Sequence, residues 1–151
     1  MAHRYLLERQ QRVRRPRPEV FAFFADAKNL ARITPPEFGF SILTPPPIEM
    51  KRGTFLEYRL KLYGIPFRWQ TFIEEFEPGV RFVDIQVKGP YRLWRHTHEF
   101  VEQDGATLLR DRLEYELPLG PLGRVAHAFA VERQLHRIFD YRRRVIETVF
   151  E

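Results

Sequence analysis

Residues 93–117 read LWRHTHEFVEQDGATLLRDRLEYEL, two runs of alternating side chains separated by Asp104-Gly105. Asp-Gly is a strong signal for the two-residue turn of a β-hairpin. Because a hairpin turn sets the register of its strands, we expect His98 directly opposite Asp111. Most charged residues of the two runs then share one face. The other face, which we predict to point inward, carries Trp94, His96, His98, Phe100, Leu109, Asp111, Leu113 and Tyr115.

A second hairpin is predicted upstream, with Gly64-Ile65 as its two-residue loop. This register pairs Leu60 with Trp69 and Tyr58 with Thr71. The intervening positions are mostly charged, which is typical of a solvated face. The inner face of this hairpin then carries Leu56, Tyr58, Leu60, Leu62, Phe67, Trp69, Thr71 and Ile73.

The strand that follows Pro78-Gly79 allows two interpretations. A two-residue loop places Asp84 opposite Ile73 and Gln86 opposite Thr71, with both polar side chains facing inward. Alternation of apolar residues instead places residues 83, 85 and 87 inside. If they face outward, they form an apolar stripe that suits a dimer interface, so monomer and homodimer both stay open. The stripe would comprise Phe72, Val83, Ile85 and Val87.

The flanking segments complete an α+β chain. A first strand is expected from Arg4 to Arg14, followed by two short helices that end at Pro35-Pro36. Apolar residues from Leu122 to Val149 recur at helical spacing and predict one C-terminal helix of about 25–30 residues. A curved antiparallel sheet of six to seven strands wrapped on this helix is the helix-grip fold. With 151 residues, we expect a single domain over 1–151.

Composition narrows the function. Aromatic residues make up 15% of the chain, which indicates a bulky core or a ring-lined cavity. The absence of cysteine excludes disulfides, thiolate nucleophiles and cysteine-ligated metals. The N-terminus lacks a signal-peptide core and no apolar run spans a bilayer, so we expect a cytoplasmic protein without stable membrane insertion. The net charge of +5 is compatible with transient contact with anionic membranes.

The polar residues of the inner face are the main chemical signal. His98 with Asp111, beside His96, can fix strand register, bind a ligand carbonyl or hydroxyl, or move a proton. Two histidines and a carboxylate also suit zinc or iron, but no further motif supports a metal, so we expect neither metal nor cofactor. Ser41 has no nucleophile context. The arginines at 12–17 and 142–144 are interpreted as solvated surface, without a nucleic-acid partner.

Several of these segments resemble the SRPBCC superfamily, which includes START lipid-transfer domains, the birch-pollen allergen fold and polyketide cyclases. The resemblance implies a ligand cavity between sheet and helix and favours Asp84 and Gln86 facing it. Members range from carriers to enzymes, so fold alone does not give function. The resemblance rests on Pro18-Glu19-Val20-Phe21, Asn29-Leu30 before Thr34-Pro35-Pro36, Gly64 to Trp69, Arg81 to Asp84, Gly89-Pro90-Tyr91 with Trp94, His96, His98 and Phe100, Asp111 with Tyr115, and Pro118-Leu119-Gly120.

The predicted function is binding or transport of a small hydrophobic ligand, such as a lipid, quinone, polyketide or aromatic ring compound. The alternative is a cyclase or dehydratase in which His98 and Asp111 perform acid–base chemistry. The polar contacts are expected from Thr71, Asp84, Gln86, His96, His98 and Asp111. The walls are expected from Leu56, Tyr58, Leu60, Trp69, Ile73, Trp94, Phe100, Leu113, Tyr115 and, from the C-terminal helix, Phe129.

Overall fold

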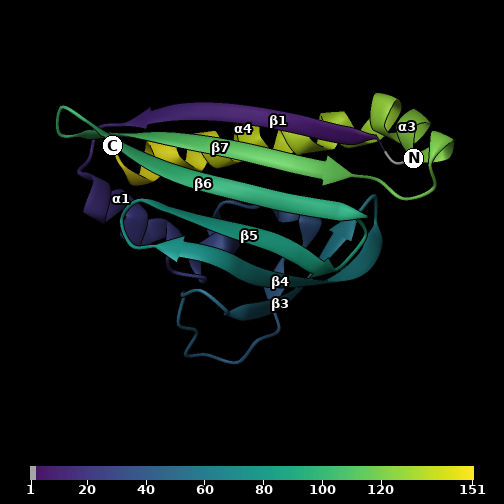
Figure 1. The fold of residues 1–151 in the computed structure, drawn as a ribbon, viewed down its shortest axis with the longest axis horizontal. Helices are drawn as coiled ribbons and strands as arrows, with labels where there is room; N and C mark the ends of the chain where they lie inside the picture. The colour runs from purple at the N-terminus through teal and green to yellow at the C-terminus, as the bar shows by residue number, and fades with distance from the viewer. Residues whose placement is uncertain (1–2) are drawn as a thin grey trace.

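A computed structural model describes residues 3–151 and contains one seven-stranded antiparallel sheet (Figure 1). The strand order is β1-β7-β6-β5-β4-β3-β2, so the first and last strands of the chain are neighbours. The strands are β1 (Arg4–Val13), β2 (Ser41–Ile42), β3 (Phe55–Leu62), β4 (Ile65–Glu77), β5 (Arg81–Lys88), β6 (Leu93–Gln103) and β7 (Ala106–Glu116). The helical segments are α1 (Arg17–Phe24), α2 (Asn29–Arg32), the 3₁₀ turn η1 (Pro36–Phe38), α3 (Pro121–Ala126), the π turn η2 (His127–Val131) and α4 (Glu132–Val149).

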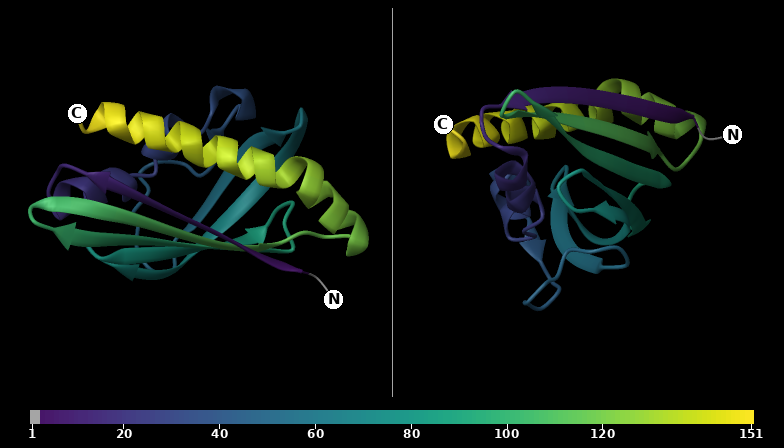
Figure 2. Two further views of the ribbon diagram at one scale, coloured as in Figure 1. Left: turned by 90° about the horizontal axis from the view of Figure 1, so that it is seen from above. Right: turned by 60° about the vertical axis from the view of Figure 1, so that its left-hand side comes forward.

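The sheet curves around α4, which crosses its concave face (Figure 2). The helix α1 lies near the C-terminal end of α4, where its phenylalanines pack against Phe100 and Ile146. This arrangement is the helix-grip fold expected from the sequence. Among residues 3–151, no helix is both long and apolar enough to cross a lipid bilayer.

The C-terminal helix is continuous from α3 to α4 but contains the π turn η2. A π turn is wound more loosely than an α-helix, so residues spaced by four stay on one face. His127, Val131 and Leu135 therefore all point toward the sheet and are buried. Phe129 lies on the opposite side and is 72% exposed. Its predicted place in the cavity wall is wrong, because the helical period alone does not reveal a π turn.

The β6–β7 register is confirmed: His98 faces Asp111 and Trp94 faces Tyr115. The β3–β4 register differs from its prediction, because the turn is Tyr63-Gly64. Both turn residues have positive φ (54° and 76°), as a type I′ turn requires. The pairing on β4 moves by two residues, and since side chains alternate with period two, the predicted inner face is unchanged.

The β4–β5 hairpin resolves the two interpretations in favour of Asp84. Asp84 faces Ile73 and Gln86 faces Thr71, as the two-residue loop predicted. The turn is longer than that loop, and an irregularity between Ile73 and Glu75 restores the register. Val83 therefore points to the outer face of the sheet, where it pairs with Glu75 and is nevertheless fully buried.

Candidate functional site

A cavity of about 170 Å³ lies between the sheet, α4 and the segment that contains α1 and α2. Ten of the predicted site residues line it, and they come from four neighbouring strands. The inner-face assignment of both hairpins and of β5 placed them correctly. They are Leu56, Tyr58, Leu60, Trp69, Thr71, Ile73, Asp84, Trp94, His96 and His98.

Three other predicted residues belong to the packed core. Phe100 is 2% exposed and packs its ring against Phe21 and Phe24, and Leu113 is fully buried. The hydroxyl of Tyr115 is hydrogen-bonded to Nε2 of His127 at 2.7 Å, which ties β7 to the π turn. All three face inward as predicted, but they pack against neighbouring side chains and do not line the cavity.

Gln86 and Asp111 also lie outside the cavity lining. The side-chain amide of Gln86 donates to the carbonyl oxygen of Tyr91 at 2.7 Å and accepts from its N–H at 3.0 Å, so it holds the β5–β6 connection. Asp111 is covered by His96 and by Arg142 of α4. The structure therefore places Gln86 and Asp111 outside the predicted cavity wall, because their polar atoms are engaged by Tyr91 and by His96 and Arg142, respectively.

A large part of the cavity wall was not predicted from the sequence. Side chains from the α1–α2 segment and from α4 close the cavity opposite the sheet. The helical period of α4 was a usable signal for its inner face, whereas the α1–α2 segment is too short to show one. The missed lining residues are Phe23, Phe24, Asp26, Ala27, Asn29, Leu30, Ile33, Thr34, Phe40, Met50, Phe82, Tyr91, Gln134, Leu135, Ile138, Phe139 and Arg142. Leu62 also lines the cavity and had been predicted on the inner face, but not as a site residue.

Arg142 is the most consequential of these residues. It is 8% exposed, which corrects its interpretation as solvated surface. Its Nη2 lies 3.0 Å from Oδ1 of Asp111, and its guanidinium stacks over Phe24 and Phe139 at 5.0 and 5.6 Å from the ring centres. Arg142 is the first of three consecutive arginines, and α4 turns only this one toward the sheet. A run of arginines therefore gave no indication that one of them is buried.

The two cavity histidines each bind a carboxylate on a neighbouring strand. Nε2 of His98 lies 2.6 Å from Oδ2 of Asp84, and Nε2 of His96 lies 2.9 Å from Oδ1 of Asp111. Asp111 is the residue directly opposite His98 in the sheet, yet its oxygen is 3.6 Å from Nδ1 of His98. Both histidines thus use diagonal partners, and the predicted His98–Asp111 pair is replaced by His98–Asp84.

Burial and charge set the protonation states of this cluster. Burial and electrostatic repulsion from His96 lower the pKa of His98 to about 4. The hydrogen bond to Asp84 acts in the opposite direction but is outweighed. Burial raises the pKa of Asp111, but the Arg142 charge and the His96 hydrogen bond outweigh it, and the net pKa is lowered. The pKa of Asp84 is also lowered, because the hydrogen bond from His98 and the nearby positive charges together outweigh burial. At neutral pH, a neutral His98 therefore donates to an ionised Asp84.

Three residues of this cluster are also close enough together to be considered as metal ligands. Ligand atoms of Asp84, His96 and His98 lie within 4.8 Å of one another. The two imidazole rings are tilted against each other, with centroids 3.7 Å apart and 32° between their planes. Their Nε2 atoms already have carboxylate partners, and the geometry fits a hydrogen-bonded cluster better than a metal centre.

Aromatic side chains surround the polar cluster. The hydroxyl of Tyr58 is hydrogen-bonded to Oγ1 of Thr71 at 3.0 Å, and burial raises the pKa of that phenol. Trp69 and Trp94, the two tryptophans of the chain, meet edge to face at 4.9 Å. Both line the cavity, so it combines an aromatic wall with one acidic and imidazole-bearing end.

This architecture agrees with comparisons against known proteins. Residues 13–139 match the family described as polyketide cyclase / dehydrase and lipid transport. The chain belongs to this family. The match confirms the resemblance to the SRPBCC superfamily that was read from the sequence. Among functionally curated proteins, no sequence matches this chain.

Solved structures with the same fold cover nearly the whole chain but share little sequence with it. The protein TTHA0849 from Thermus thermophilus is 13% identical, with a TM-score of 0.73 over 97% of this chain and 100% of its own. The Zhui aromatase/cyclase from Streptomyces sp. R1128 is 17% identical, with a TM-score of 0.73 over 95% and 92%. A START superfamily protein from Mycobacterium smegmatis is 14% identical, with a TM-score of 0.70 over 95% and 98%.

Proposed function

We propose that the cavity binds a small hydrophobic ring compound that carries a hydroxyl group. The observation that carries this proposal is the hydrogen-bonded pair of Asp84 and His98, which lines a cavity whose walls are mostly apolar and aromatic. Ligand sites are typically apolar with a few polar groups that orient the ligand. The family includes lipid-transport proteins as well as cyclases, which is consistent with this assignment.

The size of the cavity supports a ring rather than a long chain. Its volume is about 170 Å³, and an apolar cavity of roughly 150 Å³ holds benzene. One or two fused rings therefore fit with little rearrangement. A lipid or extended polyketide would require the α1–α2 segment or α4 to move outward.

The polar end favours a ligand that donates a hydrogen bond. An ionised carboxylate has about four acceptor sites, and among residues 3–151 Asp84 receives one side-chain hydrogen bond, from His98. A phenol or alcohol donates to a remaining site of Asp84. Tyr58 and Thr71 share one hydrogen bond, which commits one of their two hydroxyl protons and leaves Asp84 as the ionised acceptor of this group.

The enzymatic alternative has weaker support. A general base works best when its pKa lies near the operating pH, and the pKa of His98 at about 4 makes it a poor base. Asp111, the second catalytic candidate, is held by Arg142 and His96 away from the cavity. Acid–base chemistry here would have to use His98 with Asp84.

Fluorescence titration tests the binding proposal, because both tryptophans line the cavity. We expect 2-naphthol to change tryptophan emission saturably, with a dissociation constant on the order of 10⁻⁶–10⁻⁴ M. The variant Ala27→Phe fills the cavity and should abolish the response, whereas Ala22→Phe on the exposed side of α1 should keep it. An unsaturable signal, or equal responses from both variants, would refute binding in this cavity.

A further inference from the structure

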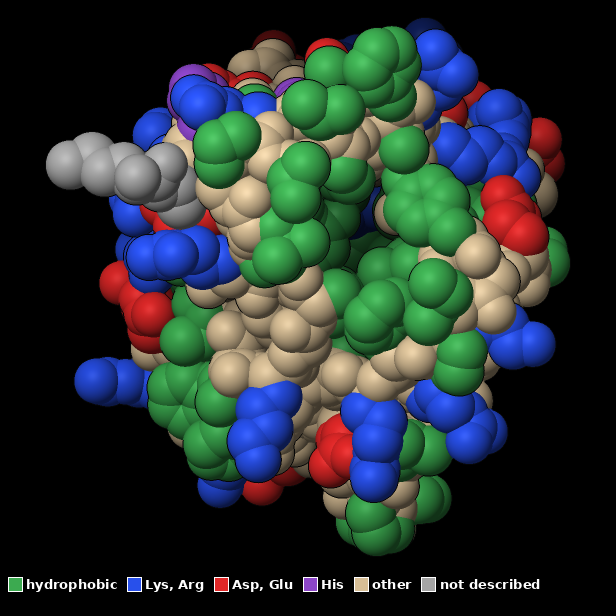
Figure 3. Space-filling model, turned by 90° about the vertical axis from the view of Figure 1, so that its right-hand side faces the viewer, with side chains coloured by type: hydrophobic (Ala, Val, Ile, Leu, Met, Phe, Trp, Pro, Cys, Tyr) green, Lys and Arg blue, Asp and Glu red, His purple; other side chains and the backbone are tan. Residues whose placement is uncertain are grey.

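The helix α3 presents an apolar face to solvent. Four large side chains before and along the start of the C-terminal helix have exposed fractions of 56–75%. They lie on the end of the molecule that Figure 3 faces, where hydrophobic side chains gather around a hollow. We call this set the α3 face: Leu119, Leu122, Val125 and Phe129.

The packing of the opposite side of the helix determines that the α3 face points outward. A Cβ on Gly123 would lie 2.3 Å from the carbonyl oxygen of Pro118, so the helix is pressed against the preceding chain on that side. One turn later, His127 is buried and hydrogen-bonded to Tyr115. These contacts fix which side of α3 points inward, and Leu122 and Phe129 stay on the other side.

Two further large apolar side chains are exposed on the β3–β4 hairpin. The β3–β4 turn lies at the same end of the molecule as α3 (Figures 1 and 2). Its residues Tyr63 and Ile65 are 58% and 57% exposed. Isolated exposed apolar residues are ordinary in soluble proteins, but several large ones at one end of a domain indicate an interaction surface.

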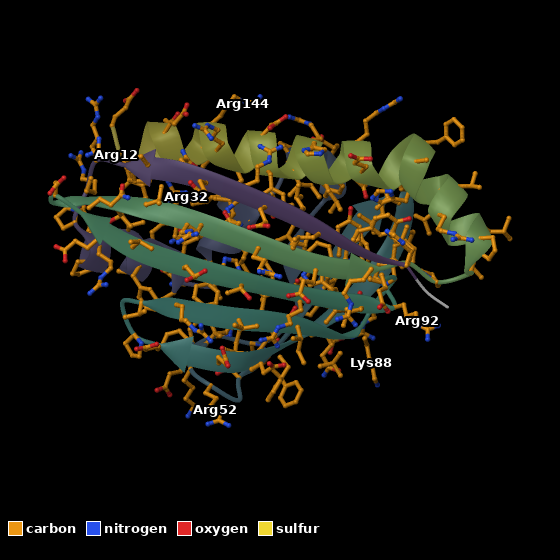
Figure 4. All side chains as sticks on the ribbon, turned by 45° about the horizontal axis from the view of Figure 1, so that its top comes forward. Arg12, Arg32, Arg52, Lys88, Arg92 and Arg144 are labelled. Carbon is orange, nitrogen blue, oxygen red and sulfur yellow. The ribbon has the colours of Figure 1, made fainter. Side chains whose placement is uncertain are left out.

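Basic side chains accompany this surface. Arg124 is exposed on α3 itself, and Lys88 and Arg92 lie at the same end (Figure 4). The acidic Glu116 at this end is paired with Arg4 and Arg92. Protruding apolar side chains with arginine and lysine beside them have the composition of an interfacial membrane contact.

We propose that the α3 face docks on an anionic lipid bilayer, which lets a hydrophobic ligand pass between the bilayer and the cavity without crossing water. A second copy of the chain is the less suitable occupant. A stable interface buries about 800 Å² on each partner, and four protruding side chains beside like-charged arginines fall short of this. The transfer role rests on the proposed ligand binding, whereas the docking rests on the exposed face alone.

Vesicle binding without ligand tests the docking separately from the cavity. The protein should co-sediment with vesicles of phosphatidylcholine and phosphatidylglycerol, and more weakly with pure phosphatidylcholine or at high salt. The double variant Leu122→Glu with Phe129→Glu should lose at least about tenfold in partitioning. The control Phe55→Glu, at a similarly exposed aromatic residue on β3, should partition like the unmodified protein.

A site-specific probe shows which surface meets the lipid. The chain has no cysteine, so Leu122→Cys or Phe55→Cys gives a single site for an environment-sensitive fluorophore. We expect a blue shift with anionic vesicles, and quenching by brominated lipid, at position 122 but not at 55. Equal responses at both positions, or none at 122, would overturn the proposal. A concentration-dependent blue shift without vesicles would also overturn it, in favour of self-association.

Discussion

Nε2 of His98 lies 2.6 Å from Oδ2 of Asp84, although Asp111 is the residue directly opposite His98 in the sheet. Arg142 explains this choice, because it draws Asp111 toward α4 with a 3.0 Å ion pair. Asp84 is then the carboxylate that meets both His98 and the cavity. The acid that faces the cavity and the acid that attaches α4 to the sheet are thus different residues.

Asp84→Asn should weaken binding of 2-naphthol by about tenfold, because a hydrogen bond to a charged acceptor is lost. Naphthalene, which has the same rings and no hydroxyl, should bind the variant and the unmodified protein alike. Tryptophan fluorescence titration measures both affinities. If both ligands weaken equally, Asp84 supports the cavity without recognising the hydroxyl.

Arg142→Met should reduce the free energy of unfolding by about 3–5 kcal/mol, because it removes the charged partner of a buried carboxylate. The neighbouring Arg144 is exposed, and Arg144→Met should change it by less than about 0.5 kcal/mol. Urea denaturation followed by far-UV circular dichroism gives both values. Similar losses in the two variants would contradict the assigned role of the Arg142–Asp111 pair.

Stability should fall as the pH drops from about 6.5 to 4. The pKa of His98 is about 4 in the folded protein and near 6.5 when unfolded, so in this range the unfolded chain binds the extra proton. The loss should reach about 3 kcal/mol, since one pKa unit corresponds to about 1.4 kcal/mol. His98→Gln should flatten this slope, and urea midpoints across the range measure it. An unchanged slope in the variant would assign the pH dependence to other groups, such as His127, whose pKa is also lowered by burial.

Leu135→Ala should cost about 2–5 kcal/mol, whereas Phe129→Ala should cost less than about 0.5 kcal/mol. Leu135 is 1% exposed and Phe129 is 72% exposed, although both belong to the same continuous helix. Chemical denaturation of the two variants tests the orientation of that helix. A large loss for Phe129→Ala would place its ring in the core after all.

Local turn chemistry explains how much of the sheet was predictable. Asp104-Gly105 suits its turn so well that the β6–β7 register followed directly, and with it the inward direction of His96 and His98. At the β3–β4 turn, the residue at positive φ before glycine is Tyr63, which carries no turn signal, so the register was displaced. The residues predicted on the inner face were nevertheless correct, because the register was displaced by an even number of residues.

The parts of the site that escaped prediction depend on contacts between distant segments. The helical period places Arg142 on the same face of α4 as Phe139 and Ile146, but an arginine is expected in solvent unless a buried partner such as Asp111 is known. The choice of Asp84 over Asp111 as the partner of His98 follows from the same contact. The family resemblance did favour an inward-facing Asp84, which the structure has, but it also favoured Gln86, whose amide is used by the backbone of Tyr91.

The π turn at His127–Val131 amounts to one surplus residue in the helix. Deleting a single residue there would restore uniform α-helical winding and rotate α3 against α4 by about 100°, the angle of one α-helical residue. The side chains that now meet solvent would swing toward the sheet, and Tyr115 would lose its partner. A one-residue deletion at this place would therefore change which side chains of α3 are exposed to solvent. The cavity-lining residues of α4 would keep their positions.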